Sequence, residues 1–112
     1  MGGQQVKAVR RDEEFEIRFT VEEREPILGV ALVDDAVAEL LRRATDVERG
    51  EIAVPCSADV LDDVLGAIAA AANHCDEAKL RSRLDRLVDR LEKLERTLLV
   101  LDERRRVRVA AA

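Results

Sequence analysis

The sequence predicts an α+β fold, a small helix-dominated bundle with a short two-stranded sheet and a long C-terminal helix built on leucine heptads. Leucines near the C-terminus recur at alternating steps of four and three, the spacing of one face of a helix. Two other stretches have helical apolar spacing, and two short stretches alternate apolar and polar residues as strands do. The length of 112 residues fits one domain. We place this domain at residues 13–102, between a flexible leader (1–12) and a basic tail (103–112).

Both strands are predicted from patterns of period two. In residues 14–21, apolar and polar residues alternate, and this stretch holds both aromatic side chains of the chain. Residues 51–54 alternate in the same way. Pro55 follows them and is expected to end the strand, because proline has no N–H to donate to a sheet. We expect these two strands to pair with each other.

A short helix is expected directly after the first strand. Thr20 and Glu23 have the spacing of a capping box, in which each side chain bonds to the backbone of the other residue. Pro26 lies too deep for the first turn, so we expect the helix to be short or kinked. Residues 27–33 are apolar without a clear period, and they fit either a buried strand or the lead-in to a helix.

Three further helices are expected, and each begins near a side chain that can cap its N-terminus. They cover residues 35–45 after Asp34, 57–74 with Ser57, and 77–102 after Asp76.

The leucine pattern of the last helix has two interpretations. If this helix packs as an antiparallel hairpin against residues 57–74, the leucines close a core within one chain. If two copies associate, the same leucines form the seam of a homodimer. Val88 adds apolar surface at the edge of the pattern. The seam residues are Leu80, Leu84, Leu87, Val88, Leu91, Leu94, Leu98 and Leu101.

Composition disfavours binding to nucleic acids or membranes. Acidic residues outnumber basic ones by 24 to 19, giving a net charge of -5, whereas phosphate binding needs a basic surface. Aromatic residues make up only 2% of the chain, so bases find no stacking platform. The longest apolar run, residues 64–72, is shorter than the roughly 20 residues of a membrane helix. With two cysteines and no signal-peptide pattern, we expect a cytoplasmic protein with reduced thiols.

No residue pattern indicates catalysis or a bound cofactor. The sequence lacks a glycine-rich phosphate loop, a nucleophile elbow and a zinc-protease motif. Cys56, His74 and Cys75 are metal-ligand types, but zinc sites usually contain paired ligands at short spacing. His74 and Cys75 are adjacent in sequence, so their side chains diverge around a helix. Helix capping explains most of the carboxylates.

One segment resembles uncharacterised bacterial proteins of the plasmid-type open-reading-frame group. Residues 72–80 read ANHCDEAKL and residues 84–87 read LDRL, and in that group an Ala-Asn-His turn precedes a charged amphipathic helix. Residues 19–24 are similar to an upstream strand-to-helix turn there. The resemblance implies a bacterial protein and a recurring structural turn at Asn73 and His74, with side chains bonded to local backbone. It implies no activity.

Taken together, these patterns favour a non-enzymatic interaction module that self-associates as a homodimer through apolar helix faces and has room for a further protein partner. Two alternatives stay open. One is a small regulator that contacts nucleic acid through the arginines of residues 104–108, and the other is a metal-binding protein that uses Cys56, His74 and Cys75.

Overall fold

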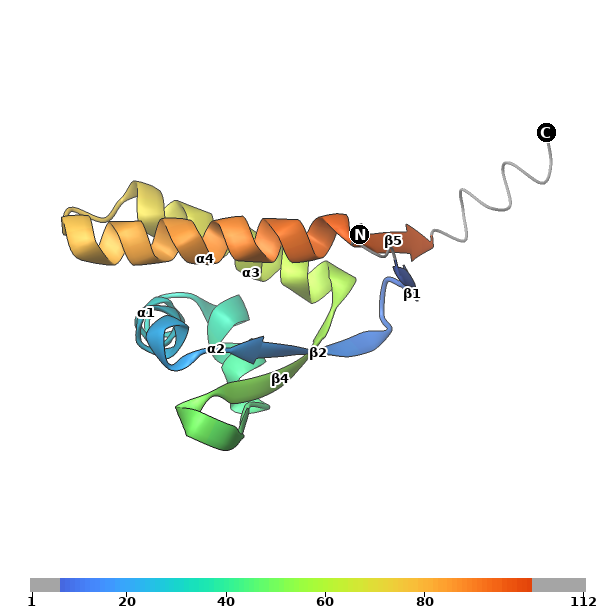
Figure 1. The fold of residues 1–112 in the computed structure, drawn as a ribbon. Helices are drawn as coiled ribbons and strands as arrows, with labels where there is room; N and C mark the ends of the chain where they lie inside the picture. The colour runs from blue at the N-terminus through green and yellow to red at the C-terminus, as the bar shows by residue number, and fades with distance from the viewer. Residues whose placement is uncertain (1–6, 102–112) are drawn as a thin grey trace, which may run out of the picture.

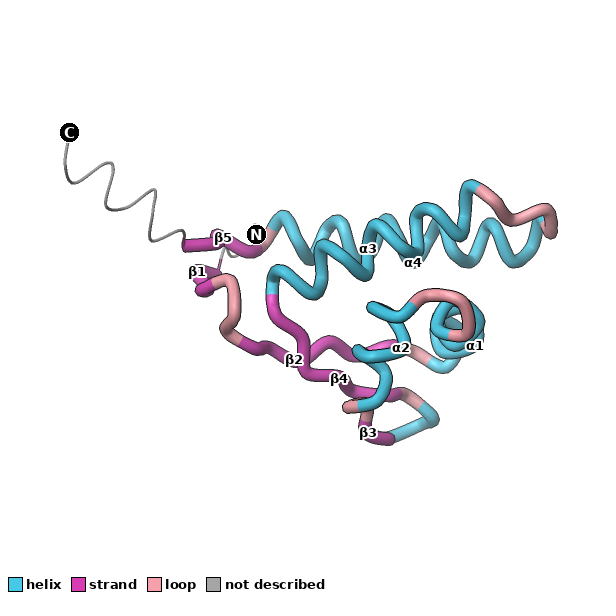
Figure 2. Tube along the Cα trace, turned by 180° about the vertical axis from the view of Figure 1, so that it is seen from behind, coloured by secondary structure: helices cyan, strands magenta, loops and turns pink. Residues whose placement is uncertain are grey.

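The computed structural model describes residues 7–101 and places a pair of antiparallel helices over a small sheet (Figure 1). Helix α3 (Ala58–Asn73) and helix α4 (Ala78–Arg96) form a hairpin along one side of the molecule. Two shorter helices, α1 (Val21–Ala31) and α2 (Asp35–Arg42), lie beneath this hairpin beside the sheet, as Figure 2 shows from behind. The predicted α+β, helix-dominated fold class is confirmed.

The main sheet has three antiparallel strands in the order β2–β4–β3. Strand β2 (Glu14–Phe19) pairs with β4 (Ile52–Ser57), with Ile17 opposite Val54. Strand β3 (Thr45–Asp46) pairs with the other edge of β4. The predicted pairing of the first two strands is confirmed. Strand β3 was not predicted, because its two residues are polar and too few to show an alternating pattern.

Pro55 lies inside β4, so the prediction that this proline ends the strand is wrong. Strand β3 runs only opposite Ala53 and Ile52, and among the described strands Pro55 has a neighbour on the β2 side alone. A proline is tolerated at such an edge position, because its missing N–H need not break a ladder bond.

Helix α1 begins with the predicted capping box. The N–H of Glu23 donates to Thr20 Oγ1 at 3.2 Å, and the N–H of Thr20 donates to Glu23 Oε1 at 2.9 Å. The helix then continues to Ala31, so most of the ambiguous stretch 27–33 is helix rather than strand.

Pro26 lies within α1 and removes one backbone hydrogen bond from it. The carbonyl of Glu22, four residues earlier, receives no N–H from this proline. Arg83 Nη2 of α4 donates to that carbonyl instead, at 3.4 Å. A side chain from a different helix therefore replaces the missing bond, and α1 extends for 11 residues despite the proline.

The next two helices also begin as predicted. Asp34 Oδ1 accepts a hydrogen bond from the Val37 N–H at 3.1 Å and caps α2. Ser57 Oγ accepts from the Val60 N–H at 3.3 Å and caps α3. A short 3-10 turn (Glu48–Gly50) leads into β4.

The long C-terminal helix is shorter than predicted at both ends. Glu77 rather than Asp76 is the N-cap residue of α4, and its side chain makes no capping bond. The helix ends at Arg96, and Leu98–Leu101 form strand β5, so a single helix over 77–102 is not supported. Four consecutive apolar residues suit a strand better than a helix with one buried face.

Strand β5 pairs in parallel with β1 (Lys7–Arg10), with Lys7 opposite Leu98. Residues 7–10 thus form a strand inside the stretch that the sequence assigns to a flexible leader over 1–12. The predicted basic tail, 103–112, lies outside the described residues.

The core fills the space between the helical hairpin, the short helices and the sheet. No buried residue within 7–101 is polar or charged. The largest fully buried side chains are Phe19, Ile27, Leu61, Ile68, Leu87 and Leu91.

Candidate interaction surfaces

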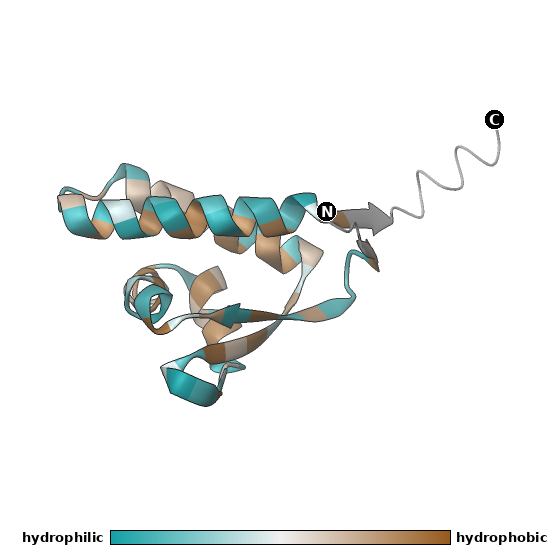
Figure 3. Ribbon diagram, viewed as in Figure 1, coloured by the Kyte–Doolittle hydropathy of each residue, from teal (hydrophilic) through white to brown (hydrophobic). Residues whose placement is uncertain are grey.

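The leucine seam of α4 faces the interior of its own chain. Leu84, Leu87 and Leu91 are only 3%, 1% and 0% exposed. Figure 3 shows the outer side of α4 as mostly hydrophilic. The other seam residues with described side chains are partly buried and pack against the core: Leu80, Val88, Leu94 and Leu98. This burial supports the hairpin interpretation, and it leaves the three central leucines no free surface for a second copy.

Arg90 fastens α4 to the start of α1. Its Nε lies 2.5 Å from Glu23 Oε2 and its Nη2 lies 2.8 Å from Glu23 Oε1, so the ion pair is bidentate. Nη2 also donates to the Arg18 carbonyl at 2.8 Å, and the guanidinium lies 5.7 Å from the centre of the Phe19 ring. Glu23 therefore caps α1 and binds α4 with the same carboxylate.

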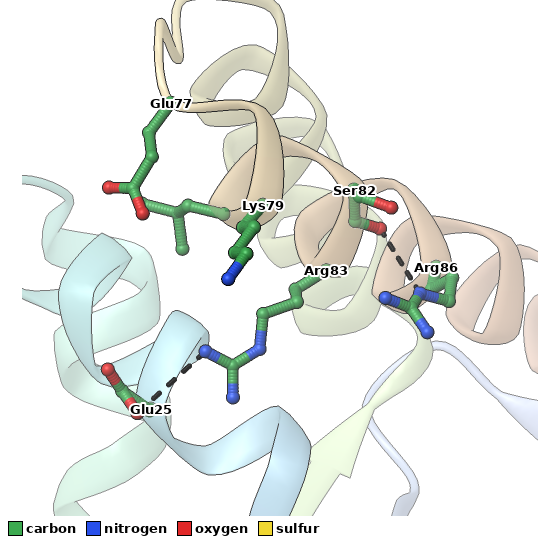
Figure 4. A pocket seen from close by; sticks show the side chains of 7 residues that line it. Glu25, Glu77, Lys79, Ser82, Arg83 and Arg86 are labelled. Atoms are coloured by element: carbon green, nitrogen blue, oxygen red, sulfur yellow. Dashed lines mark hydrogen bonds and ion pairs between the residues drawn. The ribbon is translucent and has the colours of Figure 1, made fainter.

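A hollow lies between α1 and the first half of α4 (Figure 4). It has two parts of about 420 and 320 Å³, and both are lined by Arg83 and Arg86. Arg83 Nη1 lies 3.8 Å from Glu25 Oε2 across this hollow. Its charged lining residues are four basic ones (Lys79, Arg83, Arg86, Arg90) and four acidic ones (Glu22, Glu23, Glu25, Glu77). Each part is lined by three basic and two acidic side chains, so charges of both signs meet in the hollow.

The outer face of α1 exposes Glu22 and Glu25 in its first half and is apolar in its second half. Val21, Leu28 and Leu32 lie on one side of the helix, seven and four residues apart, and they are 55%, 46% and 87% exposed. Val33, which follows in the turn to α2, is 85% exposed. We call these four residues the α1 patch. They are four of the five large apolar side chains that are exposed within the described chain.

The inner face of α1 is apolar as well, since Pro26, Ile27 and Val30 are buried in the core. A helical segment that is apolar all round, as α1 is after Glu25, is normally covered on every side. The sequence already held this signal, because residues 27–33 are apolar without a helical period. From the sequence alone this stretch fits either a strand or a helix, and no contact surface is predicted there.

The structure does not bring Cys56 and His74 together. Cys56 precedes the N-terminus of α3 and His74 follows its C-terminus, so the length of a 16-residue helix separates them, roughly 24 Å at 1.5 Å per residue. Residues 7–101 contain no group of three or more His, Cys, Asp or Glu side chains that would hold a metal ion. Burial, and then the Glu14 carboxylate, raise the pKa of Cys56 to about 12, so its thiol stays protonated at neutral pH.

Carboxylates meet between α3 and α4 at Glu95. Partial burial, a hydrogen bond with Asp62, and the negative charges of Asp62 and Glu92 together raise the pKa of Glu95. The folded state therefore favours the protonated form of Glu95, and ionisation of Glu95 opposes the packing of α4 on α3.

The arginines of residues 104–108, proposed for nucleic-acid contact, lie outside the described residues. No helix in the described part of the chain is both long and apolar enough to cross a membrane. Comparison with protein-family models, with curated proteins and with solved structures found no match.

Proposed function

We propose that the protein is a non-enzymatic interaction module that binds a helix of a protein partner on the α1 patch. The observation that carries this proposal is that the second half of α1 and the turn after it are apolar on both faces, although only the inner face is covered within the chain. Contiguous exposed apolar surface on a soluble protein usually marks a contact site.

The free energy available from burying the α1 patch is large enough to support such a contact. Fully burying a leucine or valine side chain contributes about 1.5–3 kcal/mol. Leu32 and Val33 keep more than four fifths of their surface in solvent, so a partner gains nearly this full amount from each. Leu28 and Leu32, one helical turn apart, form a ridge of the kind that packs into the groove of a second helix.

The test is an NMR titration of the labelled protein with a designed helical peptide that carries leucines along one face and uncharged glutamine and alanine elsewhere. We expect amide shifts confined to α1 and the turn that follows it, because that is where apolar surface is free. In the Leu32→Gln variant, the affinity should fall by about tenfold, the equivalent of 1.4 kcal/mol.

Val60 offers a matched control, because it is also an exposed aliphatic residue (37%) but lies on α3. Val60→Gln should bind the peptide as the wild type does. Shifts spread along α3 and α4, or equal losses in the two variants, would contradict the proposal.

A second candidate function, self-association through β5, is favoured by a different observation. Strands β1 and β5 form a separate two-stranded parallel sheet. Sheets of two strands are marginal in water, and parallel strands are normally buried on both sides. Two copies that paired their β5 strands around a two-fold axis would make one four-stranded sheet. This arrangement retains two predicted seam residues, Leu98 and Leu101, as dimer residues.

Solution mass by light scattering, together with two proline variants, tests this second candidate. Successive N–H groups of a strand point to opposite edges, so either Leu99→Pro or Val100→Pro removes a donor from the outer edge of β5. The wild type should be a dimer, and at least one variant should be a monomer. A wild type that stays monomeric at high concentration would rule out self-association.

A further inference from the structure

We infer that the partner helix of the α1 patch carries basic residues beside its apolar stripe and is not a second copy of this chain. This inference rests on the proposed function and names the chemistry of the partner. It follows from the charges that surround the patch.

The segment from the middle of α1 to Leu41, one residue before α2 ends at Arg42, carries negative charges only. Between residues 25 and 41 the charged residues are Glu25, Asp34, Asp35 and Glu39, and this stretch contains no lysine or arginine. Four negative charges therefore fall in the segment that contains Leu28, Leu32 and Val33, while the whole chain has a net charge of -5. An acidic rim around an apolar centre favours a partner of the opposite charge.

Glu25 and Asp35 keep most of their charge available to a partner, whereas Glu39 forms an ion pair with Arg42 within α2, at 2.5 Å. Asp35 lies exposed in the first turn of α2. The Glu25 side chain is 81% exposed, and its ion pair with Arg83 is long, at 3.8 Å. Such an exposed pair neutralises little charge. Asp34 caps α2 by accepting a hydrogen bond from the Val37 N–H.

The nearest arginine on α1 itself is directed elsewhere. Arg24 Nη1 donates to the Gly50 carbonyl at 3.2 Å, and its Nη2 lies 3.4 Å from Asp46 Oδ1. The basic residues of α4 line the hollow on the side of α1 that carries Glu22 and Glu25. The acidic end of the patch is therefore the turn from α1 to α2, and the basic flank of the partner is expected there.

A second copy fits this surface poorly. In a two-fold contact the same patch faces itself. Two copies joined through α1 would bring their acidic segments together, and like charges brought together across a contact oppose association. A basic amphipathic helix meets the same apolar residues without this repulsion.

The experiment compares three designed peptides with the same leucine stripe, flanked by lysine, by glutamine or by glutamate. We expect the lysine peptide to bind most tightly and the glutamate peptide most weakly, with about a tenfold difference between them at low salt. That difference should shrink at 0.5 M salt, because ions screen exposed charges.

Paired charge-removing variants locate the effect. Asp35→Asn with Glu25→Gln should abolish the preference for the lysine peptide while the glutamine peptide still binds. The control, Asp85→Asn with Asp89→Asn, removes the same charge from exposed positions on α4 and should leave the preference intact.

The outcomes separate this inference from the proposed function. If all three peptides bind α1 equally, the inference of a basic partner helix is wrong, while the proposal that the α1 patch binds a helix is supported. If none binds α1, both fail. If α1 amides shift on dilution without peptide, and the solution mass falls with them, a second copy occupies the patch and the inference is overturned.

Discussion

Helices α4 and α1 both carry prominent leucines, but they use them in opposite ways. The leucines of α4 follow a strict heptad, and the three central ones are at most 3% exposed in a single chain. The leucines of α1 follow no heptad, and Leu28 and Leu32 are 46% and 87% exposed. A helix with a single apolar stripe buries that stripe in one packing contact. A helix with apolar residues outside one stripe leaves some of them exposed, where another chain can bind.

The helix partners explain this difference. Helix α4 has α3 along its length and α1 at its first half, so its single apolar face is closed within the chain. Helix α1 packs its inner face on the core, and the α1 patch stays largely exposed, with Val21 lying beside Gly50 at one end and Leu32 and Val33 most open at the other. A heptad pattern therefore indicates a long helix with a buried seam, and it does not by itself indicate a coiled-coil dimer.

The largest expected effect is on the α4 side of the comparison. Leu87→Ala and Leu91→Ala should each lower the free energy of unfolding by about 2–5 kcal/mol, because each leaves a cavity in a closed core. Leu32→Ala should change it by less than about 0.5 kcal/mol, as an exposed substitution does. Urea unfolding followed by circular dichroism measures all three. Similar losses of unfolding free energy for Leu32→Ala and Leu91→Ala would contradict the assignment of Leu91 to the core and of Leu32 to the surface.

A medium effect is expected where the two helices are joined. Arg90→Met should cost about 1–2 kcal/mol, because it removes a bidentate ion pair and a bond to the Arg18 carbonyl. A double-mutant cycle with Glu23→Gln should give a coupling of about 1 kcal/mol from the same unfolding experiment. Arg18→Met, in an exposed pair with Glu16, should show little coupling to Glu16→Gln. An equally small coupling energy between Arg90 and Glu23 would contradict the proposal that this ion pair joins α4 to α1.

The smallest expected effect is electrostatic and depends on pH. The pKa of Glu95 is raised in the folded state above its ordinary value of 4.5, so folding favours the protonated form. Its contribution to stability is therefore complete below that ordinary value and is lost as the pH rises through the folded pKa.

Glu95→Gln should accordingly stabilise the protein at pH 7, by up to about 1 kcal/mol, and by less at pH 4. Thermal unfolding at both pH values measures this difference. Glu48→Gln, in the exposed turn before β4, is the control. A gain for Glu95→Gln that is equal at pH 4 and pH 7 would contradict the assignment of the raised pKa.

Local features of the fold could be predicted from the sequence. The caps at Thr20, Asp34 and Ser57 form within one turn of the chain, so the residues that specify them are neighbours in sequence. The pairing of β2 with β4 followed from two matched alternating patterns.

Features that depend on residues distant in the sequence could not be predicted. Whether Pro55 is tolerated depends on how far β3 extends along β4. The hydrogen bond that replaces the one lost at Pro26 comes from Arg83, 57 positions further along the chain. The end of α4 depends on the pairing of β5 with residues at the opposite end of the sequence. For the same reason, the sequence pointed to the α4 seam as the contact surface, while the exposed face of α1 emerged only from the fold.

The same lysine substitution, placed once within α4 and once at the C-cap of α1, separates the roles of the two helices. Urea unfolding and the neutral-peptide titration are compared for Leu87→Lys and Leu32→Lys. We expect Leu87→Lys to be unfolded, because it places a charge in the closed core. Leu32→Lys should keep wild-type stability within about 0.5 kcal/mol and lose peptide binding. A folded Leu87→Lys, or a Leu32→Lys that still binds the peptide on α1, would contradict the assignment of α4 to the core and of α1 to the partner.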